Sequence, residues 1–452
     1  MATIPQARLF SWKQIEARSD LDRLRMVLAV VPDEGLMRKL EAFRGKGRDD
    51  YPVRAVWNSL LAAVVYQHPS VASVRRELLC NGELRGLCGF DPLQGAEVVP
   101  PESAYTRFLK SLFRFPSEIE AMFDELFERL GLVLPELGKH LAADSKAIPS
   151  AGKPTDRAAD GRRDTDGNWG VKTYRGRRKD GTLWERVKRW FGYKLHLVVD
   201  ATYELPLAFE VTRASASDTT RLLPMIEGFK ERHGCVLARA EYLAADRGYD
   251  SEDNNRELYD AYGIVPLIGI RHDWKDGEET RALYPDRVDN IVTDEEGSIF
   301  CVRRSSRDVH QMETIPMAFY GFERDRKTVK YRCPAAAYGY ECVDREECCC
   351  GVYGRSVRVP LDVDRRRFVP VPRGSYKWRR LYGRRTAVER VNSRLDVSFG
   401  FERHFIRGMT KMRVRVGMAL VVMLAMALGS IEVGEQYRMR SLVWSTRLPR
   451  AA

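Results

Sequence analysis

The sequence predicts an α/β protein, in which a three-layer α/β domain is interrupted by a β-rich insertion and preceded by an all-α region. Three observations support this prediction. Apolar residues recur with helical spacing up to about residue 135, and buried strands then alternate with helices up to about residue 270. Short alternating runs replace both patterns from 271 to 375. Helical spacing returns afterwards, so residues 376–452 are expected to complete the α/β domain.

Length, charge and composition exclude several classes of protein. A chain of 452 residues can form two or three domains with a sizeable core. Its 75 Lys and Arg against 63 Asp and Glu leave a net charge of +12, which favours polyanionic partners. A hydrophobic content of 44% excludes a disordered chain and a polytopic membrane protein. The longest apolar run, 416–428, is shorter than the ~18 residues of a membrane span. No secretory signal precedes it, so a cytoplasmic protein without a membrane partner is expected.

Residues 1–135 are expected to be helical. Segments 20–28 and 52–65 carry apolar residues three and four positions apart, and Pro52 suits a first helical turn. Segment 103–113 keeps the same spacing and begins with Ser103, a good N-cap residue. A small helical region with basic faces can bind DNA, and it can equally be a plain helical scaffold.

The elements of the α/β domain follow in order. They are a short strand 141–144 ending at Asp144, a strand pair over 191–200 and 205–212 joined by turn 201–204, a helix over 219–233 closed by Gly234, a strand ending at Asp246, a helix over 251–262 and a strand over 264–270. In the insertion, turns are expected at Glu296–Gly297 and Asp325–Arg326. Beyond it, a helix over 384–395 precedes the apolar helix 416–428, which is expected to pack on the sheet.

Three carboxylates are candidates for metal chemistry. Asp144 and Asp246 both follow the letters Leu-Ala-Ala, so both are expected at a strand end, where α/β folds place their chemistry. Each could instead simply begin a turn. Glu389 lies in a charged helix, where a solvated surface residue is the alternative. Two Asp and one Glu suffice to hold Mg²⁺ for phosphodiester cleavage, and Arg385, one helical turn before Glu389, could clamp a phosphate.

The sequence around these carboxylates resembles that of a known protein family. Tyr382, Arg385 and Glu389 match the Tyr-x2-Arg-x3-Glu-x6-Lys signature of DDE transposases encoded by bacterial insertion sequences. Further segments of the chain resemble the same group, namely 51–54, 101–110, 192–200, 205–212, 245–250, 399–403 and 407–408. One departure stands out, because the Lys of the signature is Asp396 here.

The resemblance implies an RNase H-like catalytic domain in two parts, 136–270 and 376–452. The insertion 271–375 lies between these parts, and a helical DNA-binding domain, 1–135, precedes them. It also implies that Asp144, Asp246 and Glu389 bind Mg²⁺ or Mn²⁺, and that Tyr382 and Arg385 contact the DNA end. Arg394 is a further candidate DNA contact close to Asp396.

The function implied is that of a DDE transposase, which binds the terminal inverted repeats of its element and catalyses DNA cleavage and strand transfer into target DNA. It would act as a homodimer or higher oligomer at the nucleoid. Two alternatives stay open: a transposase-derived DNA-binding protein without catalysis, and an RNase H-like metal-dependent nuclease.

Two basic tracts with interleaved aromatic residues predict DNA contacts. The tract from Lys153 to Lys194 is expected to be a mobile loop beside Asp144, with Lys172, Arg177 and Arg178 as candidate contacts; a solvated loop is the alternative. The tract from Arg365 to Arg394 leads into Glu389 and adds Lys377 and Arg379. Trp274 could stack on an extruded base, although packing is the more usual role of a tryptophan.

The insertion contains a cluster of five cysteines, which predicts a structural Zn²⁺. Its members are Cys333, Cys342, Cys348, Cys349 and Cys350. The spacing lacks the Cys-x2-Cys pairs of most zinc sites, so plain thiols are the alternative. The remaining cysteines, Cys80, Cys88, Cys235 and Cys301, are interpreted as ordinary buried thiols, and His140 and His196 as core or rim residues.

Overall fold

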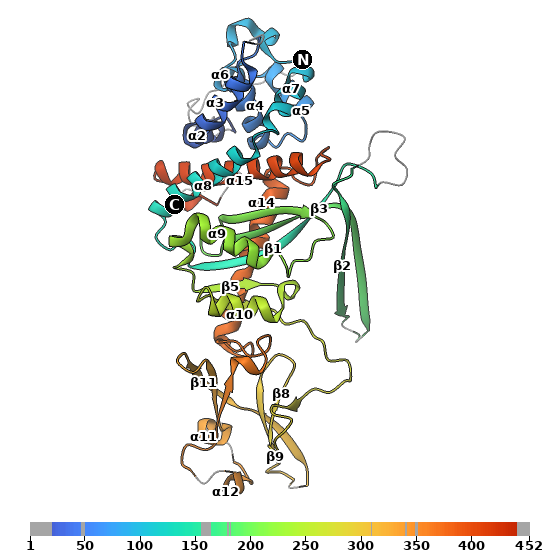
Figure 1. Ribbon diagram of the computed structural model, residues 1–452, viewed down its shortest axis with the longest axis vertical. Helices are drawn as coiled ribbons and strands as arrows, with labels where there is room; N and C mark the ends of the chain where they lie inside the picture. Colours follow the sequence, from blue (N-terminus) through green and yellow to red (C-terminus); the bar gives the residue numbers. More distant parts are fainter. Residues whose placement is uncertain are drawn as a thin grey trace, which may run out of the picture.

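The computed structural model describes residues 20–46, 50–154, 164–178, 180, 182–308, 310–339, 341–348 and 351–440. Figure 1 shows an elongated molecule with the N-terminal helices at one end, a mixed sheet in the middle and a smaller β-rich part at the other end. A two-stranded ribbon projects sideways from the central sheet. The fold is therefore mixed α/β, as predicted.

The first part of the described chain is built from helices, which confirms the expected elements at 20–28, 52–65 and 103–113. These helices are α2 (Asp20–Val30), α3 (Glu34–Arg44), α4 (Val53–Val65), α5 (Val71–Cys80), α6 (Gly82–Cys88), α7 (Glu102–Leu112) and α8 (Pro116–Val133), with a 3-10 segment η1 (Pro92–Val98) between α6 and α7. Local sequence explains two of the starts. Ser70 forms a capping box with Ser73 at α5, and Pro116 occupies the first turn of α8.

The central sheet has six strands: β1 (His140–Pro149), β2 (Asn168–Arg177), β3 (Leu183–Asp200), β4 (Pro206–Arg213), β5 (Tyr242–Ala245) and β6 (Val265–Ile268). Its order is β4-β3-β1-β5-β6, and β2 pairs with the first half of β3. Strands β4, β3 and β1 are antiparallel neighbours, whereas β5 and β6 run parallel to β1. Figure 1 shows α9 (Leu222–Leu237) and α10 (Glu252–Asp260) in front of this sheet and α14 (Thr386–Ser398) behind it.

Two of the expected element ends are wrong. Strand β1 does not end at Asp144 but continues to Pro149, because β3 pairs with it along its whole length, up to Pro149 opposite Gly192. Helix α9 does not end at Gly234 either. It has a kink at His233, where φ is −135° and ψ is 44°, and then continues to Leu237. Asp144 therefore lies within a strand, whereas Asp246 directly follows β5 as expected.

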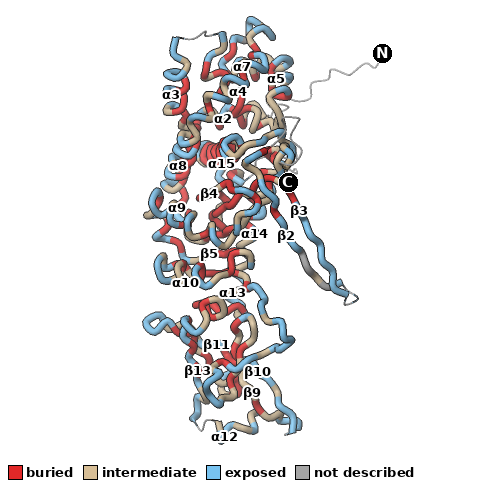
Figure 2. Tube along the Cα trace, turned by 45° about the vertical axis from the view of Figure 1, so that its right-hand side comes forward, coloured by how far each residue is buried: buried red, intermediate tan, exposed pale blue. Residues whose placement is uncertain are grey.

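The basic tract 153–194 is not a loop in its described part, and this expectation is corrected. It forms an antiparallel ribbon of β2 and the first half of β3, which we call the arm. On one face, the ring of Trp190 covers Gly170 and the ring of Trp184 covers Gly176, so the glycines leave room for the indoles of the opposite strand. Figure 2 shows that the arm is mostly exposed.

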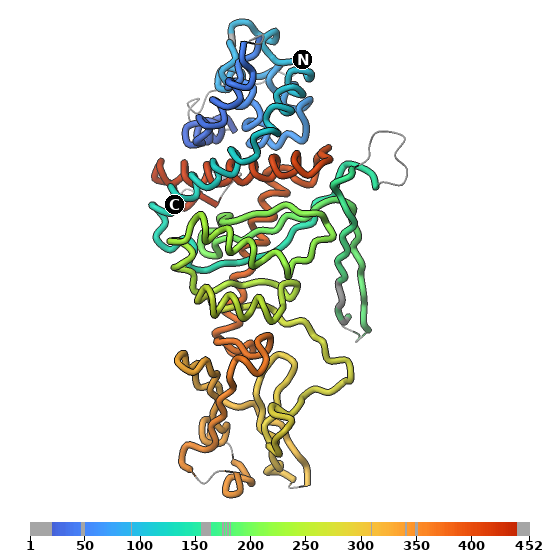
Figure 3. The backbone as a smooth tube through the Cα atoms, in the orientation of Figure 1, coloured from blue at the N-terminus to red at the C-terminus, as the bar shows by residue number. Residues whose placement is uncertain are grey.

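The insertion leaves the sheet after β6 and returns before α13 (Tyr376–Tyr382), as the colour sequence in Figure 3 shows. Its first sheet contains β7 (Arg281–Ala282), β8 (Ile291–Thr293), β9 (Ile299–Arg304) and β10 (Met312–Pro316). Its second sheet contains β11 (Ala318–Glu323), β12 (Thr328–Arg332) and β13 (Ser356–Pro360). The short helices α11 (Pro334–Tyr338) and α12 (Arg345–Cys348) lie between β12 and β13 in the chain. Both expected turns are confirmed. The insertion has its own small core, which includes Ile291, Ile299, Val329, Val359 and Phe368.

Helix α15 (Met409–Glu432) is the central core helix rather than a helix that lies only on the sheet. It packs mainly against α8 and α2, and also against β4. Its 24 residues are long and apolar enough to cross a membrane by length and composition, but 89% of its most apolar window is buried inside the protein. One continuous core joins this helix, the N-terminal helices and the sheet, so packing is not interrupted near residue 135.

Gly192 is expected to be indispensable where β3 passes from the sheet into the arm. Its φ is +149°, and a Cβ there would collide with the backbone oxygen of Ile148 and the backbone nitrogen of Ser150. Gly192→Ala should lower the free energy of unfolding by about 2 kcal/mol, measured by urea denaturation. Gly228→Ala is the control, because its Cβ would meet only Arg232 at 3.6 Å in a helix interior. Equal stability of the two variants would contradict this account.

Candidate active site

The repeated tetrapeptide Leu-Ala-Ala-Asp pairs with itself across the sheet. Leu141 lies opposite Leu243, and the two following alanines of each strand are paired in the same register. Asp144 and Asp246 come next on the two parallel strands. The Asp144 Oδ1 accepts a hydrogen bond from the backbone N–H of Ser145 at 2.7 Å, and the Asp246 Oδ1 accepts one from the N–H of Gly248 at 2.8 Å. The register thus places two carboxylates side by side.

The environment of Asp144 disfavours its charge. Burial raises the pKa of this carboxyl to about 6, and the neighbouring negative charge of Asp246 acts in the same direction. Lys172, the N–H of Ser145 and Arg385 lower the pKa and offset part of this effect. The side chain of Asp144 is only 14% exposed. Two crowded carboxylates with incomplete compensation form a set of hard oxygen donors that a divalent cation would stabilise.

Arg385 connects this pair to Glu389. Its Nη2 donates to Glu389 Oε1 at 2.7 Å, and its Nη1 lies 3.9 Å from Asp144 Oδ2. Glu389 belongs to α14, which packs against β1 and β3. Its side chain is 51% exposed, so its carboxylate is free to move away from Arg385. The three predicted carboxylates and Arg385 all line one cavity of about 990 Å³.

The cavity is lined by both acidic and basic side chains. Its basic residues are Lys146, Lys172, Lys188, Lys194, Arg247, Arg271 and Arg385. Two further carboxylates are neutralised by partners, because Lys194 donates to Asp218 at 2.9 Å and Lys146 pairs with Asp396. Lys172 and Lys188 reach the wall from the arm, which therefore forms one side of the cavity. Sequence reasoning missed Lys146, although its position two residues after Asp144 puts it on the same strand face.

Tyr382 adjoins the site from α13. Its ring stacks on Trp378, with 4.3 Å between the ring centroids, and Arg385 lies 5.9 Å from the Tyr382 centroid. Burial raises the pKa of the Tyr382 phenol. Tyr382 and Asp246 share a second, smaller cavity of about 310 Å³. On the same helix, Lys377 and Arg379 are exposed, and the Nζ of Lys377 lies 5.7 Å above the ring centroid of Tyr242.

Several predicted contacts do not join the cavity. Arg394 is 12% exposed and binds Glu204 of the β3–β4 turn, donating to its backbone oxygen at 2.8 Å and to its carboxylate. Arg178 lies at the tip of the arm, and the side chain of Arg177 lies outside the described part of the structure. Trp274 is contacted by the guanidinium groups of Arg281 and Arg367, at 4.2 and 5.5 Å from its ring, and is therefore held by its own insertion.

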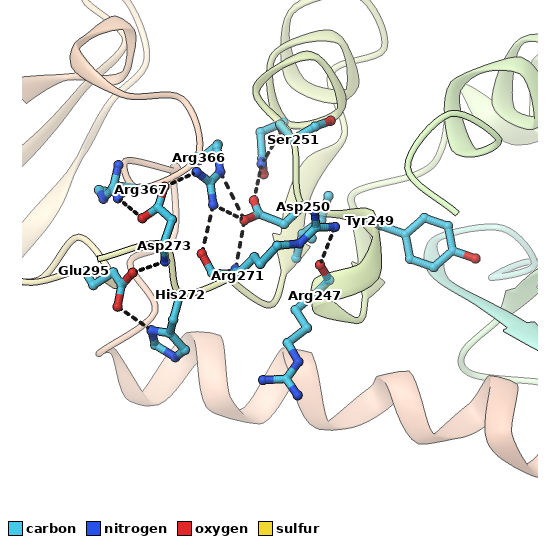
Figure 4. A network of polar contacts seen from close by, with 12 residues as sticks. Arg247, Tyr249, Asp250, Ser251, Arg271, His272, Asp273, Glu295, Arg366 and Arg367 are labelled. Atoms are coloured by element: carbon cyan, nitrogen blue, oxygen red, sulfur yellow. Dashed lines mark hydrogen bonds and ion pairs between the residues drawn. The ribbon is translucent and has the colours of Figure 1, made fainter. Parts of the chain in front are cut away.

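An ion-pair network around the buried Asp250 attaches the insertion to the turn that follows Asp246 (Figure 4). Asp250, whose side chain is fully buried, accepts hydrogen bonds from Arg366 at 2.8 and 3.1 Å and from the N–H of Arg271 at 2.9 Å. Arg366 also donates to Asp273 at 2.7 Å. The hydrogen bond with Asp250 raises the pKa of Arg366 above its ordinary value. The insertion thus holds the turn that follows Asp246, a role that its sequence did not indicate.

The cysteines differ from expectation. Cys80 and Cys235 are exposed and Cys301 is half-buried, so the interpretation as buried thiols holds for Cys88 alone. Burial raises the pKa of Cys301 to about 11, and the charges of Cys348, Cys333 and Cys342 add to it, so Cys301 lies near these three. Cys349 and Cys350 are outside the described residues. Zinc binding stays a prediction.

In the described ranges, no three His, Cys, Asp or Glu side chains are arranged to hold a metal ion. This finding applies to the carboxylates of the cavity as well, where Glu389 is turned toward Arg385. The two histidines interpreted as core or rim residues are found there. His196 is buried and bonds Thr212 at 2.9 Å, and His140 lies against Tyr242.

The part of the chain that contains Asp144 and Asp246 is similar to known proteins. Residues 136–316 match the family described as Transposase DDE domain. This segment of the chain is thus similar to transposase DDE domains. Over 83 residues, the chain is also 43% identical to a protein assigned as the transposase of insertion sequence element IS402 of Burkholderia cepacia. The resemblance to DDE transposases of bacterial insertion sequences is therefore confirmed.

The matches differ in how much they cover. The aligned segment is 18% of this chain and 38% of the Burkholderia relative, so the chain spans well under half of that protein's length. The cryo-EM structure of the piggyBac transposase synaptic complex with hairpin DNA matches 96% of this chain and 80% of its own, at 10% identity and a TM-score of 0.38. A TM-score of that size is below the range that indicates a shared fold. The match to the DDE domain includes Asp144 and Asp246, and it ends before Glu389.

The position of Arg394 predicts a role in stability rather than in the cavity. Arg394→Gln should lower the free energy of unfolding by about 1–3 kcal/mol, because it removes two hydrogen bonds to the buried Glu204. Arg189→Gln, on the exposed arm, should leave the melting temperature unchanged. Thermal denaturation of both variants measures the difference. A stable Arg394→Gln protein would show that the Glu204 contact contributes nothing.

Proposed function

We propose that this protein is a DDE transposase, which binds the ends of its insertion sequence and catalyses metal-dependent DNA cleavage and strand transfer. The observation that carries the proposal is the in-register pairing of β1 with β5, which sets Asp144 beside Asp246, with Glu389 lining the same cavity. We further propose that the catalytic domain is RNase H-like. Its support is the sheet itself, with three antiparallel strands followed by two parallel ones and helices on both faces.

Asp144, Asp246 and Glu389 would hold divalent cations, with Mg²⁺ or Mn²⁺ as the ions that such hard oxygen donors suit. The crowding that raises the pKa of Asp144 fits a site that gains stability when a cation enters. When bound, the ions supply activation of the attacking oxygen and stabilisation of the leaving oxygen. Glu389 must leave Arg385 to join the two aspartates, which frees the guanidinium of Arg385 for a DNA phosphate.

The chain's own groups position the DNA. Lys172 and Lys188 extend the basic wall along the arm, where they neutralise backbone phosphates. Tyr382 and Trp378 present a stacked aromatic pair beside Asp246 for the end of the duplex. In the first step, the oxygen of water bonds to phosphorus and the bond to the 3′ oxygen breaks. The oxygen of the freed 3′-hydroxyl then bonds to a phosphorus of the target DNA, and the bond from that phosphorus to its own 3′ oxygen breaks. The target strand is left with a 3′-hydroxyl that takes up the proton, and no covalent bond to protein forms.

Recognition of the element ends is assigned to the helices before residue 134 together with the arm. Two ends must be brought together, so the active form is a homodimer or a higher oligomer. Since the substrate is chromosomal DNA, the protein acts in the cytoplasm at the nucleoid. The net charge of +12 supports DNA as the partner of all these surfaces.

Replacement of a single carboxylate should abolish the chemistry and spare DNA binding. With a labelled duplex carrying the repeats that flank the gene, Asp246→Asn should reduce Mg²⁺-dependent nicking and joining at least about 100-fold while the duplex stays bound, because a metal ligand is lost. The control is Asp253→Asn on the exposed face of α10. Wild-type protein that binds but does not cut would indicate the DNA-binding alternative. Cutting without joining would indicate a nuclease, and cutting that survives Asp246→Asn would refute the triad.

The metal requirement can be tested by removing the ion. With excess EDTA, the wild-type protein should bind the duplex but neither nick nor join it, because the three carboxylates then hold no cation. Adding Mg²⁺ or Mn²⁺ should restore both reactions, which a denaturing gel of the labelled strand resolves. Undiminished cleavage in EDTA would contradict the proposed role of the carboxylates.

A further inference from the structure

Lys146 lies in the catalytic cavity but has no assigned role there. It follows Asp144 by two residues on β1, so both side chains point from the same face of the strand into the cavity. The side chain of Lys146 is 16% exposed and forms part of the cavity lining. It also lines a neighbouring cavity of about 710 Å³, distinct from the smaller one at Tyr382, so Lys146 lies where the catalytic cavity and this neighbour meet.

The partner of Lys146 is Asp396, the residue that departs from the transposase signature. Their Nζ and Oδ2 atoms form an ion pair across the cavity wall. Asp396 lies seven residues after Glu389 on α14, which is two helical turns along the same face. Its second oxygen, Oδ1, is buried and accepts no hydrogen bond from the described residues.

An ammonium group has three N–H donors, and Asp396 occupies one of those of Lys146. Two donors remain for an incoming oxygen without loss of the ion pair. Around this position, the arm supplies Lys172 and Lys188, and α14 begins beside Arg385. Lys146 completes this arrangement from the floor of the cavity, on the strand that carries Asp144.

We propose that Lys146 binds a phosphate of the DNA next to the scissile bond and that Asp396 holds its side chain in place. In the transposase signature, a Lys on the helix is the cation. Here Lys146 on β1 is the cation, and Asp396 on α14 is its acidic partner. This inference rests on the proposed transposase function. It also explains how a chain with Asp396 can keep a complete set of phosphate-binding groups.

Salt dependence of DNA binding tests the proposal without cleavage. Binding of a fluorescent duplex with the element end is measured by anisotropy in EDTA at several salt concentrations. Lys146→Met should lower the slope of log K against log salt by about 0.9, the amount lost with one phosphate contact. Asp396→Asn should leave the slope unchanged, since the cation remains. Lys230→Met on α9, which is not among the residues that line the cavity, is the control for removal of one surface charge.

Cleavage and stability distinguish positioning from a structural role. In Mg²⁺, Lys146→Met and Asp396→Asn should both reduce the rate of nicking about tenfold or more, whereas the exchanged variant Lys146→Asp with Asp396→Lys should recover most of it, and Lys146→Arg should retain binding. If the pair is only structural, both single variants lower the melting temperature, the salt slope stays at the wild-type value, and the proposal is overturned.

Two other results are informative. If Asp396→Asn raises the Mg²⁺ concentration for half-maximal rate and Lys146→Met changes no slope, Asp396 is a metal-binding carboxylate and the proposal is wrong. If wild-type protein binds the duplex but does not cut it, the transposase proposal fails, yet the slope of Lys146→Met still decides whether Lys146 contacts a phosphate. The two failures are therefore separable.

Discussion

The parallel pairing of β1 with β5 is the constraint on which the rest of the site depends. The side-chain period of a strand is two, so a slip of one residue would turn Asp144 or Asp246 to the opposite face of the sheet. The paired residues that precede them, Ala142, Ala143, Ala244 and Ala245, are all at most 2% exposed. Their small side chains let helices pack closely on both faces, and this burial makes any other register costly.

The surrounding elements adapt to the charge that this register creates. Arg385, the residue directly before α14, lies 3.9 Å from Asp144 and binds Glu389 at 2.7 Å, so one guanidinium neutralises two acids. The turn after Asp246 is held from the other side, because the buried Asp250 is bound by Arg366 of the returning chain. The site is therefore fixed by contacts between segments that are more than 100 residues apart in sequence.

Much of this architecture could be predicted from local patterns. Helical spacing identified α2, α4, α7 and α10, and the carboxylates were found from the repeated Leu-Ala-Ala-Asp and from the signature around Glu389. The errors arise where a distant partner overrides local appearance. Ser145 and Lys146 look like the start of a turn, yet β3 keeps them in a strand. The arm looks like a Gly-rich charged loop, because only the opposite strand reveals why Gly170 must be small.

Other outcomes could not be read from one segment either. In the sequence, Arg394 resembles a DNA-binding residue. In the structure, its guanidinium donates instead to Glu204, 190 positions away. Cys301 carries no signal of its nearness to Cys333, Cys342 and Cys348, since it lies on β9 whereas these three follow β12. Lys146 is the opposite case, because strand geometry alone could have placed it beside Asp144. Local rules thus identify candidates, and tertiary partners decide their roles.

We propose that Asp144, Asp246 and Glu389 form one metal site. Iron-mediated backbone cleavage can test this: Fe²⁺ replaces Mg²⁺, peroxide and ascorbate are added, and the cut positions are mapped by mass spectrometry. Cuts are expected in three separate segments, near residues 144, 246 and 389, and excess Mg²⁺ should suppress them together. Cuts near only one of these segments, or cuts confined to the insertion, would contradict it.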